Sequence, residues 1–130
     1  MRHSSVIPHW PLYSQFQVAI RFNDLKSIES LLKSGLDFDY RFGNTKEPAL
    51  CICSKLGHYE LARLLITNGC SVNLPDQNGT TALHFACIYI YVDIARLLIQ
   101  NRANLDSVNL QGDTPLHLAV HQKSLGNIRH

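Results

Sequence analysis

The chain has little of what marks an enzyme, a nucleic-acid-binding protein or a membrane protein. Its 12 Lys and Arg residues nearly balance its 10 Asp and Glu residues, and the formal net charge is only +2. The basic residues are scattered, so nothing would follow a phosphate backbone and we expect no nucleic-acid partner. No stretch approaches the roughly 18 consecutive apolar residues of a membrane-spanning helix, so we expect no membrane insertion.

Signals for export are also missing from the N-terminal segment. Residues 1–15 contain Pro8, His9 and Pro11 and have no apolar core of the length that a signal peptide needs. The four cysteines are therefore expected to be free thiols in a reducing compartment. On these absences we expect a cytoplasmic or nuclear protein.

The cysteines and histidines do not fall into a metal-binding or catalytic pattern. Cys51 and Cys53 lie one residue apart, and no second pair stands at the spacing of a zinc site. Covalent catalysis needs a nucleophile near a base and a group that orients the base, and the sequence brings no such trio together. We therefore predict no metal site, no cofactor and no enzymatic activity.

What the chain does have is an internal repeat. The five residues Ala-Arg-Leu-Leu-Ile occur at Ala62–Ile66 and again, 33 residues later, at Ala95–Ile99. The same interval separates Leu50, Leu83 and Leu116, as well as Gly79 and Gly112, and His84 and His117. A period of this length is typical of an array of small stacked units, which presents a surface and not a catalytic pocket.

Helix signals recur within each unit. In the third unit a turn at Asp76–Gly79 precedes a helix that Thr81 can cap, and the apolar residues of Asp93–Ile99 predict a second helix. In the fourth unit Thr114 is a good N-cap, and Pro115 suits the first helical position, where its missing N–H would have no partner anyway.

The fourth unit carries a resemblance to a known family. Its residues Thr114–Ala119, which read Thr-Pro-Leu-His-Leu-Ala, resemble the signature of the 33-residue ankyrin repeat. The resemblance implies an all-α repeat solenoid of stacked ankyrin helix-turn-helix units with β-hairpin loops. It also implies that His84 and His117 hydrogen-bond loop backbone and hold neighbouring hairpins together.

The repeats divide the chain as follows. We assign residues 1–12 to an N-terminal segment and 13–130 to an ankyrin repeat domain, with repeats at about 13–42, 43–75, 76–108 and 109–130. Repeat one is the weakest, with its first helix expected at Phe16–Ile20. The N-terminal segment either caps repeat one through Trp10 and Leu12, or is unstructured and offers Trp10 as a docking motif.

The fourth repeat is incomplete. If one inserted residue is allowed, Gly126–Arg129 is the first turn of its second helix, and the Leu-Leu-Ile triplet never follows. This favours a fragment or a splice form of a longer protein, with a naturally short product as the alternative.

Two residues occupy positions where other repeats have glycine. Arg102 stands at the position of Gly35 and Gly69, where a helix end enters the left-handed region. Ile90 stands at the position of Gly57, where positive φ would strain a β-branched residue by roughly 1 kcal/mol or more. Either the link at Ile90 has shifted and its side chains pack locally, or Ile88–Tyr91 forms an exposed patch that anchors a partner.

The resemblance implies that a protein partner binds the concave face formed by the first helices, together with the hairpin tips. Mapping these positions onto this sequence gives a candidate partner-binding set, in a chain that we expect to be monomeric: Phe42, Leu56, Gln77, Asn78, Ile88, Tyr89, Tyr91, Leu110 and Gln111.

Several functions remain open at this point. The first is an interaction module, such as the substrate-recognition part of an adaptor, a role in which ankyrin arrays often precede a SOCS box; no such box is visible here. The alternatives are a scaffold segment of a longer ankyrin array, or a small protein resembling the four-repeat kinase inhibitors. Asn73 also resembles the asparagine that ankyrin-directed hydroxylases modify.

Overall fold

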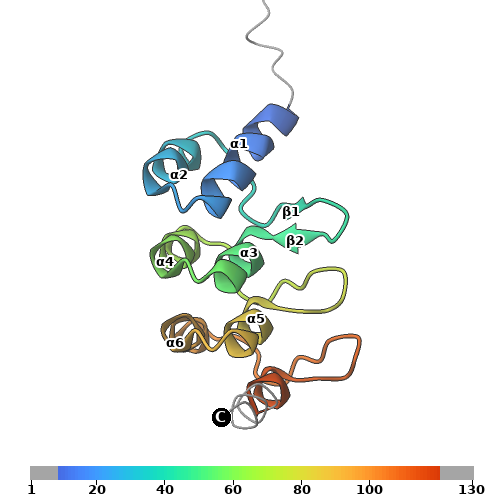
Figure 1. Ribbon diagram of the computed structural model, residues 1–130. Coiled ribbons are helices and arrows are strands. Elements are labelled where there is room, and N and C mark those ends of the chain that lie inside the picture. The colour runs from blue at the N-terminus through green and yellow to red at the C-terminus, as the bar shows by residue number, and fades with distance from the viewer. Residues whose placement is uncertain (1–8, 121–130) are drawn as a thin grey trace, which may run out of the picture. The chain divides into compact units, whose positions relative to one another are not determined.

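Paired helices joined by short turns make up most of the computed structural model, which describes residues 9–120 and the side chains from Leu12 onward (Figure 1). This agrees with the fold class predicted from the repeats. The described chain falls into two compact parts, one up to Asp37 and one from Phe38 onward.

The first part is one helix pair, α1 (His9–Arg21) and α2 (Leu25–Leu32). Phe16 and Ile20 of α1 and Ile28 of α2 have no exposed surface, because residues four apart lie on one helix face. Asp24 caps α2, where its carboxylate accepts hydrogen bonds from the Ser27 N–H at 3.2 Å and the Ser27 hydroxyl at 2.7 Å.

The helix α1 starts earlier than the sequence suggested. It includes Trp10, Pro11 and Leu12, whereas the expected first helix spanned only residues 16–20. Proline does not prevent this, because the first four N–H groups of a helix have no partner within it and Pro11 falls among them. The side chain of Trp10 lies outside the described ones, so its role as cap or docking motif stays a prediction.

The second part contains two further helix pairs and a short hairpin. Strands β1 (Arg41–Phe42) and β2 (Glu47–Pro48) pair antiparallel, and α3 (Ala49–Leu56), α4 (Tyr59–Thr67), α5 (Ala82–Ile88) and α6 (Val92–Gln100) follow. A further helix occupies residues 115–120. First helices stack on first helices, α3 against α5, and second helices on second helices, α4 against α6 (Figure 1).

The core of this second part lies between its stacked helix pairs. It consists of the apolar residues that recur with the repeat, and those that are at most 1% exposed include Ile52, Leu61, Leu65, Ile94 and Leu98. Each repeat therefore buries its apolar face against its neighbour and not around one centre.

The loops between repeats are hydrogen-bonded to one another in series. The Gln77 N–H donates to the Thr45 carbonyl at 2.8 Å, and the Leu110 N–H donates to the Asn78 carbonyl at 2.9 Å. All three loops project from the same side of the helix pairs of this part (Figure 1). Because backbone groups make these bonds, the loop tips are held in a fixed row whatever side chains they carry.

The tips of the second and third loops are also closed by a side chain at the same position of the repeat. The Asp76 carboxylate accepts from the Asn78 and Thr80 N–H groups at 2.8 and 3.0 Å. Asn109, 33 residues later, does the same for the Gln111 and Asp113 N–H groups. Short acceptor side chains at the start of a turn favour this arrangement.

The role expected of the repeated histidine is confirmed for His84. Its Nδ1 accepts from the Thr81 N–H at 3.0 Å, so Nε2 carries the proton and donates to the Asp113 carbonyl of the next loop at 2.9 Å. In repeat two this position is Cys51, whose thiol makes only the longer contacts of sulfur, 3.5 Å to the Leu74 carbonyl and 3.8 Å to that of Thr80.

The four cysteines are free thiols. Cys51 and Cys53 are fully buried, and burial raises the pKa of both thiols well above the ordinary value. Within residues 9–120, no three His, Cys, Asp or Glu side chains come together in a way that could hold a metal ion. Among the helices described, none has the length and apolar character needed to cross a membrane.

Candidate protein-binding surface

The link between the paired helices has a positive φ at the same position in each of the three repeats whose link the structure describes. Gly57 has a φ of +79°, and Asn23 and Ile90 at the same position have +55° and +59°. The link at Ile90 has therefore not shifted to relieve the β-branched side chain, and the predicted backbone strain is present there.

Apolar side chains are exposed around this strained link. Tyr89 is 49% exposed, Ile90 and Val92 are each 58% exposed, and Ile88 is half-buried. Leu56, which occupies the position of Tyr89 in the preceding repeat, is 39% exposed. We call Leu56, Ile88 and Tyr89, at the ends of the stacked helices α3 and α5, the helix-end patch.

Tyr91 lies at the border of this patch, with its ring tilted against that of Tyr89 and the two centroids 6.2 Å apart. Its ring lies against Gly57, so closely that a Cβ added at Gly57 would come within 2.8 Å of the ring. Tyr91 is also the residue that precedes α6, and it is half-buried. Its ring therefore packs one helix pair onto the previous one, and only part of it is open to a partner.

Phe42 is misplaced in the candidate set, because it is only 4% exposed. Side chains alternate along a strand, and in β1 Arg41 points to solvent while Phe42 points inward. The ring of Phe42 meets Tyr40 edge-on, with centroids 5.0 Å apart. The sequence suggested an exposed tip residue because it showed a hydrophobe in a loop but not the strand pairing that buries it.

The other candidate tip residues are exposed as expected. Gln77, Asn78, Leu110 and Gln111 all lie open to solvent, and Leu110 is 72% exposed. They lie in the hydrogen-bonded row of loops and not among the helix ends. The structure thus places the candidate residues in two groups, the helix-end patch and the tips of the second and third loops.

A polar feature beside the helix-end patch was missed by the sequence reasoning. The ammonium group of Lys55 pairs with the carboxylate of Glu47 and lies 5.4 Å from the ring centroid of Phe85. These three residues tie β2, α3 and α5 together. The sequence does contain a signal for this contact. Lys55 and Phe85 are a cation and an aromatic residue in the first helices of adjacent repeats, and they lie three positions apart when the two repeats are aligned.

Asn73 connects the turn that follows α4 to the turn that follows α6. Its side-chain oxygen accepts from the Asn104 N–H at 2.7 Å, and its amide donates to the Arg102 carbonyl at 3.3 Å. Arg102 has a φ of +70°, so it adopts the conformation predicted from its glycine-like position. Asn73 is exposed, and its modification stays a prediction.

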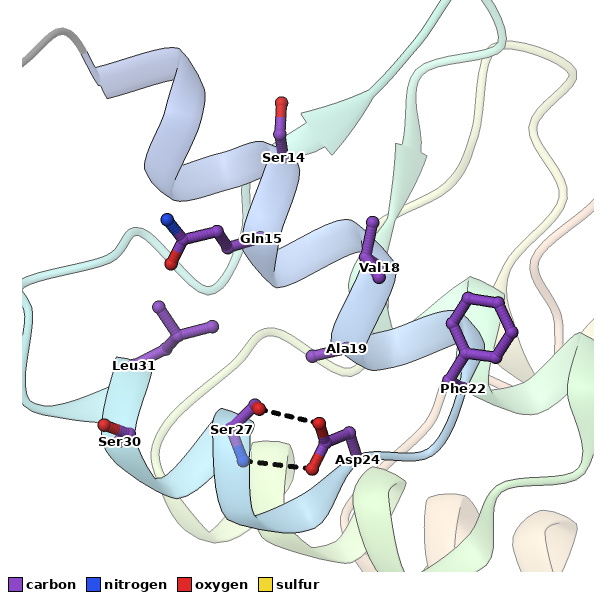
Figure 2. A pocket seen from close by; sticks show the side chains of 9 residues that line it. All are labelled: Ser14, Gln15, Val18, Ala19, Phe22, Asp24, Ser27, Ser30 and Leu31. Carbon is purple, nitrogen blue, oxygen red and sulfur yellow. Dashed lines mark hydrogen bonds between the residues drawn. The ribbon is translucent and has the colours of Figure 1, made fainter.

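The first part of the chain offers a cleft of its own, about 650 Å³ in volume, between α1 and α2 (Figure 2). The wall on the α1 side includes the exposed Val18 and, just after the helix ends, Phe22. The wall on the α2 side is polar, with Asp24 before the helix and Ser27 and Ser30 within it. Figure 2 also shows the two hydrogen bonds by which Asp24 accepts from Ser27. The carboxylate of Asp24 is thus engaged in capping α2.

Comparison with protein families settles what the repeat is. A family model described as ankyrin repeats in three copies matches residues 16–109, and a second match covers residues 50–129. The chain belongs to the ankyrin repeat family. Domains of this family are generally protein–protein interaction modules and are typically non-catalytic.

Relatives in the family are similar to the chain over part of their length. The ankyrin repeat and KH domain-containing protein mask-1 of Caenorhabditis elegans is 32% identical over 88 residues, which cover 67% of this chain and 3% of that protein. An ankyrin repeat protein of Rickettsia felis is 30% identical over 74 residues, which cover 57% of this chain and 24% of that protein. The chain thus spans a small share of each relative.

Proposed function

We propose that the chain is a recognition module, acting as the partner-selecting part of an adaptor, that binds one protein through the helix-end patch and the loop tips. The observation that carries this proposal is the apolar exposure at the ends of α3 and α5, where Leu56 and Tyr89 are 39% and 49% exposed. Tyrosine is one of the residue types enriched in the energetically dominant centre of protein interfaces.

The surroundings of the patch support the same function. Glu47, Lys55 and Phe85 hold the neighbouring surface in one arrangement, so a partner need not order it on binding. Polar tips such as Gln77 and Gln111 supply hydrogen-bonding groups of the sort found at the rim of an interface. An apolar centre with a polar rim suits a folded partner protein better than an ion or a small metabolite.

The proposal is tested by capture of partners from cell lysate with a double variant, Leu56→Glu with Tyr89→Glu. The matched control is Ile99→Glu with Leu105→Glu, because these residues have similar exposure, 49% and 54%, at other places on the same part of the chain. We expect the partner to bind the wild type and the control and to be lost from the patch variant. Identical partners on all three proteins would rule out the patch and favour a scaffold role within a longer array.

A modification of Asn73 is a second candidate, supported by its exposure to solvent. We propose that an external hydroxylase inserts one oxygen atom of O₂ into a C–H bond of its side chain, while a co-substrate of that hydroxylase is oxidised and takes up the other oxygen atom. The hydrogen bonds of Asn73 to the Asn104 N–H and the Arg102 carbonyl would then have to open first. Peptide mass spectrometry of protein purified from cells would show a mass increase of one oxygen on the peptide that contains Asn73; an unmodified peptide under all growth conditions would exclude this role.

A further inference from the structure

The tips of the second and third loops are built on the same turn. In the second loop the Gly79 N–H donates to the Asp76 carbonyl at 3.1 Å, and Gly79 has a φ of +75°. In the third loop the Gly112 N–H donates to the Asn109 carbonyl at 2.9 Å, and Gly112 has a φ of +82°. The residue before the glycine differs, because it is an asparagine in the second loop and a glutamine in the third.

This difference matters because asparagine followed by glycine can react with its own backbone. The nitrogen of the glycine attacks the side-chain amide carbon and closes a five-membered ring, whereas glutamine would have to close a six-membered ring, which is much slower. Glycine favours the attack because it has no Cβ to crowd its nitrogen and its backbone adopts many conformations. The chain contains two such pairs, Asn68–Gly69 and Asn78–Gly79.

The structure distinguishes the two asparagines by what holds their side chains. The Asn68 amide donates to the Leu64 carbonyl at 2.8 Å, which fixes it at the end of α4. Asn78 is exposed, and among the described residues none forms a hydrogen bond with its side-chain amide. The backbone does not separate the pairs, since the Gly69 N–H also donates a turn hydrogen bond, to the Ile66 carbonyl at 3.0 Å. The Asn78 amide is therefore the one that is free to meet its attacking nitrogen when the turn opens.

We propose that Asn78 is a site of spontaneous deamidation, with isoaspartate as the main product. The Gly79 nitrogen forms a bond to Cγ of Asn78 and the bond from Cγ to Nδ2 breaks. The amide nitrogen leaves as ammonia, together with the proton of the Gly79 nitrogen. Water then opens the succinimide ring: opening at the former backbone carbonyl gives isoaspartate, and opening at Cγ gives aspartate.

The product alters the contact between the two loops as well as the charge of the tip. The Leu110 N–H donates to the Asn78 backbone carbonyl at 2.9 Å. In isoaspartate the main chain runs through Cβ and Cγ, so this carbonyl becomes part of a carboxylate beside the chain, and the loop gains one methylene group. The backbone hydrogen bond between the loops is then lost, and a negative charge appears in the tip that the proposed function assigns to a partner. The reaction itself does not depend on that function.

The experiment incubates the purified full chain at mildly alkaline pH, folded in buffer and unfolded in guanidinium chloride. Peptide mass spectrometry, with fragmentation that tells isoaspartate from aspartate, measures positions 68 and 78 in the same samples. Each rate in the folded chain is divided by the rate of the same residue in the unfolded chain. We expect this ratio to be at least about fivefold higher for Asn78 than for Asn68, the factor that one ordinary hydrogen bond supplies. Equal ratios, or an Asn78 that stays intact in the folded chain, overturn the proposal.

The matched control is Asn78→Gln, which gives the second loop the residue that the third loop has at the same position, Gln111. This variant should stay unmodified and keep a constant rate of hydrogen exchange at the Leu110 amide. In the converted fraction of the wild type, that amide should exchange about fivefold or more faster, because its acceptor is lost. Unchanged exchange at Leu110 after conversion overturns the proposed break between the loops. If the variant does not fold, the comparison of Asn68 with Asn78 in the wild type still decides the site.

Discussion

His84 is fully buried and serves two loops at once, through Nδ1 to Thr81 and through Nε2 to the carbonyl of Asp113. Removal of the ring would leave a buried donor and a buried acceptor without partners. The cost of such orphaned groups exceeds the net value of the hydrogen bonds themselves. The residue thus acts on stability and on the position of the third loop together.

We expect His84→Ala to lower the free energy of unfolding by about 2–3 kcal/mol. The control is His117→Ala at the same position of the next repeat, where the ring is exposed and only its bond from the Thr114 N–H is described. That change should cost about 1 kcal/mol or less. Urea unfolding followed by circular dichroism measures both, and equal losses would show that His84 does not join the loops.

Arg102 has a strained backbone conformation that its side chain does not require. Its φ of +70° is the left-handed conformation that Gly69 adopts one repeat earlier, and its side chain is exposed. Arg102→Gly should therefore stabilise the chain by about 0.5–1 kcal/mol, a gain reduced slightly by loss of a cation near the end of α6. Arg102→Ala keeps the Cβ and should give no gain. Thermal unfolding separates the two, and a gain in the alanine variant would contradict the strain argument.

Among the elements, the links between paired helices were partly predictable from the sequence. The glycine-like positions of Ile90 and Arg102 were visible from the repeat alone, and both have the positive φ that this implies. The packing of Tyr91 on Gly57 was not visible, because it joins residues of different repeats through the shape of a ring. The same limit explains Phe42, whose burial depends on the pairing of β1 with β2.

The contact between adjacent links predicts a coupling between Gly57 and Tyr91. Gly57→Ala should cost more stability than Gly69→Ala, because both strain a positive φ but only Gly57 has a ring within 3 Å of the added Cβ. The excess, about 1 kcal/mol or more, should shrink when Tyr91 is changed to Ala in the same chain. Chemical unfolding of the single and double variants measures the coupling, and purely additive losses would show that the ring does not pack there.

At the scale of the whole chain, the periodicity of the sequence predicted the fold and the protein-binding class, because the same core positions recur in each stacked repeat. The binding residues were less accessible, since surface positions vary without a period. The exposure of the hydrophobic residues Leu56 and Tyr89 was predicted from the sequence. The contact among Glu47, Lys55 and Phe85 was not, because it depends on how β2, α3 and α5 lie relative to one another. The recurring residues of this repeat protein therefore predict its architecture, and the residues that depart from the pattern indicate its candidate binding surface.

The most direct test of the proposed function is site-specific photo-crosslinking to the captured partner. Benzoylphenylalanine is placed at Tyr89 in the helix-end patch, or at Arg96, an exposed position of α6, and both proteins are irradiated in the same lysate. The proposal predicts one dominant covalent adduct from position 89 and none of that mass from position 96. The same adduct from both positions, or an adduct from position 96 alone, would contradict a binding surface at the ends of α3 and α5.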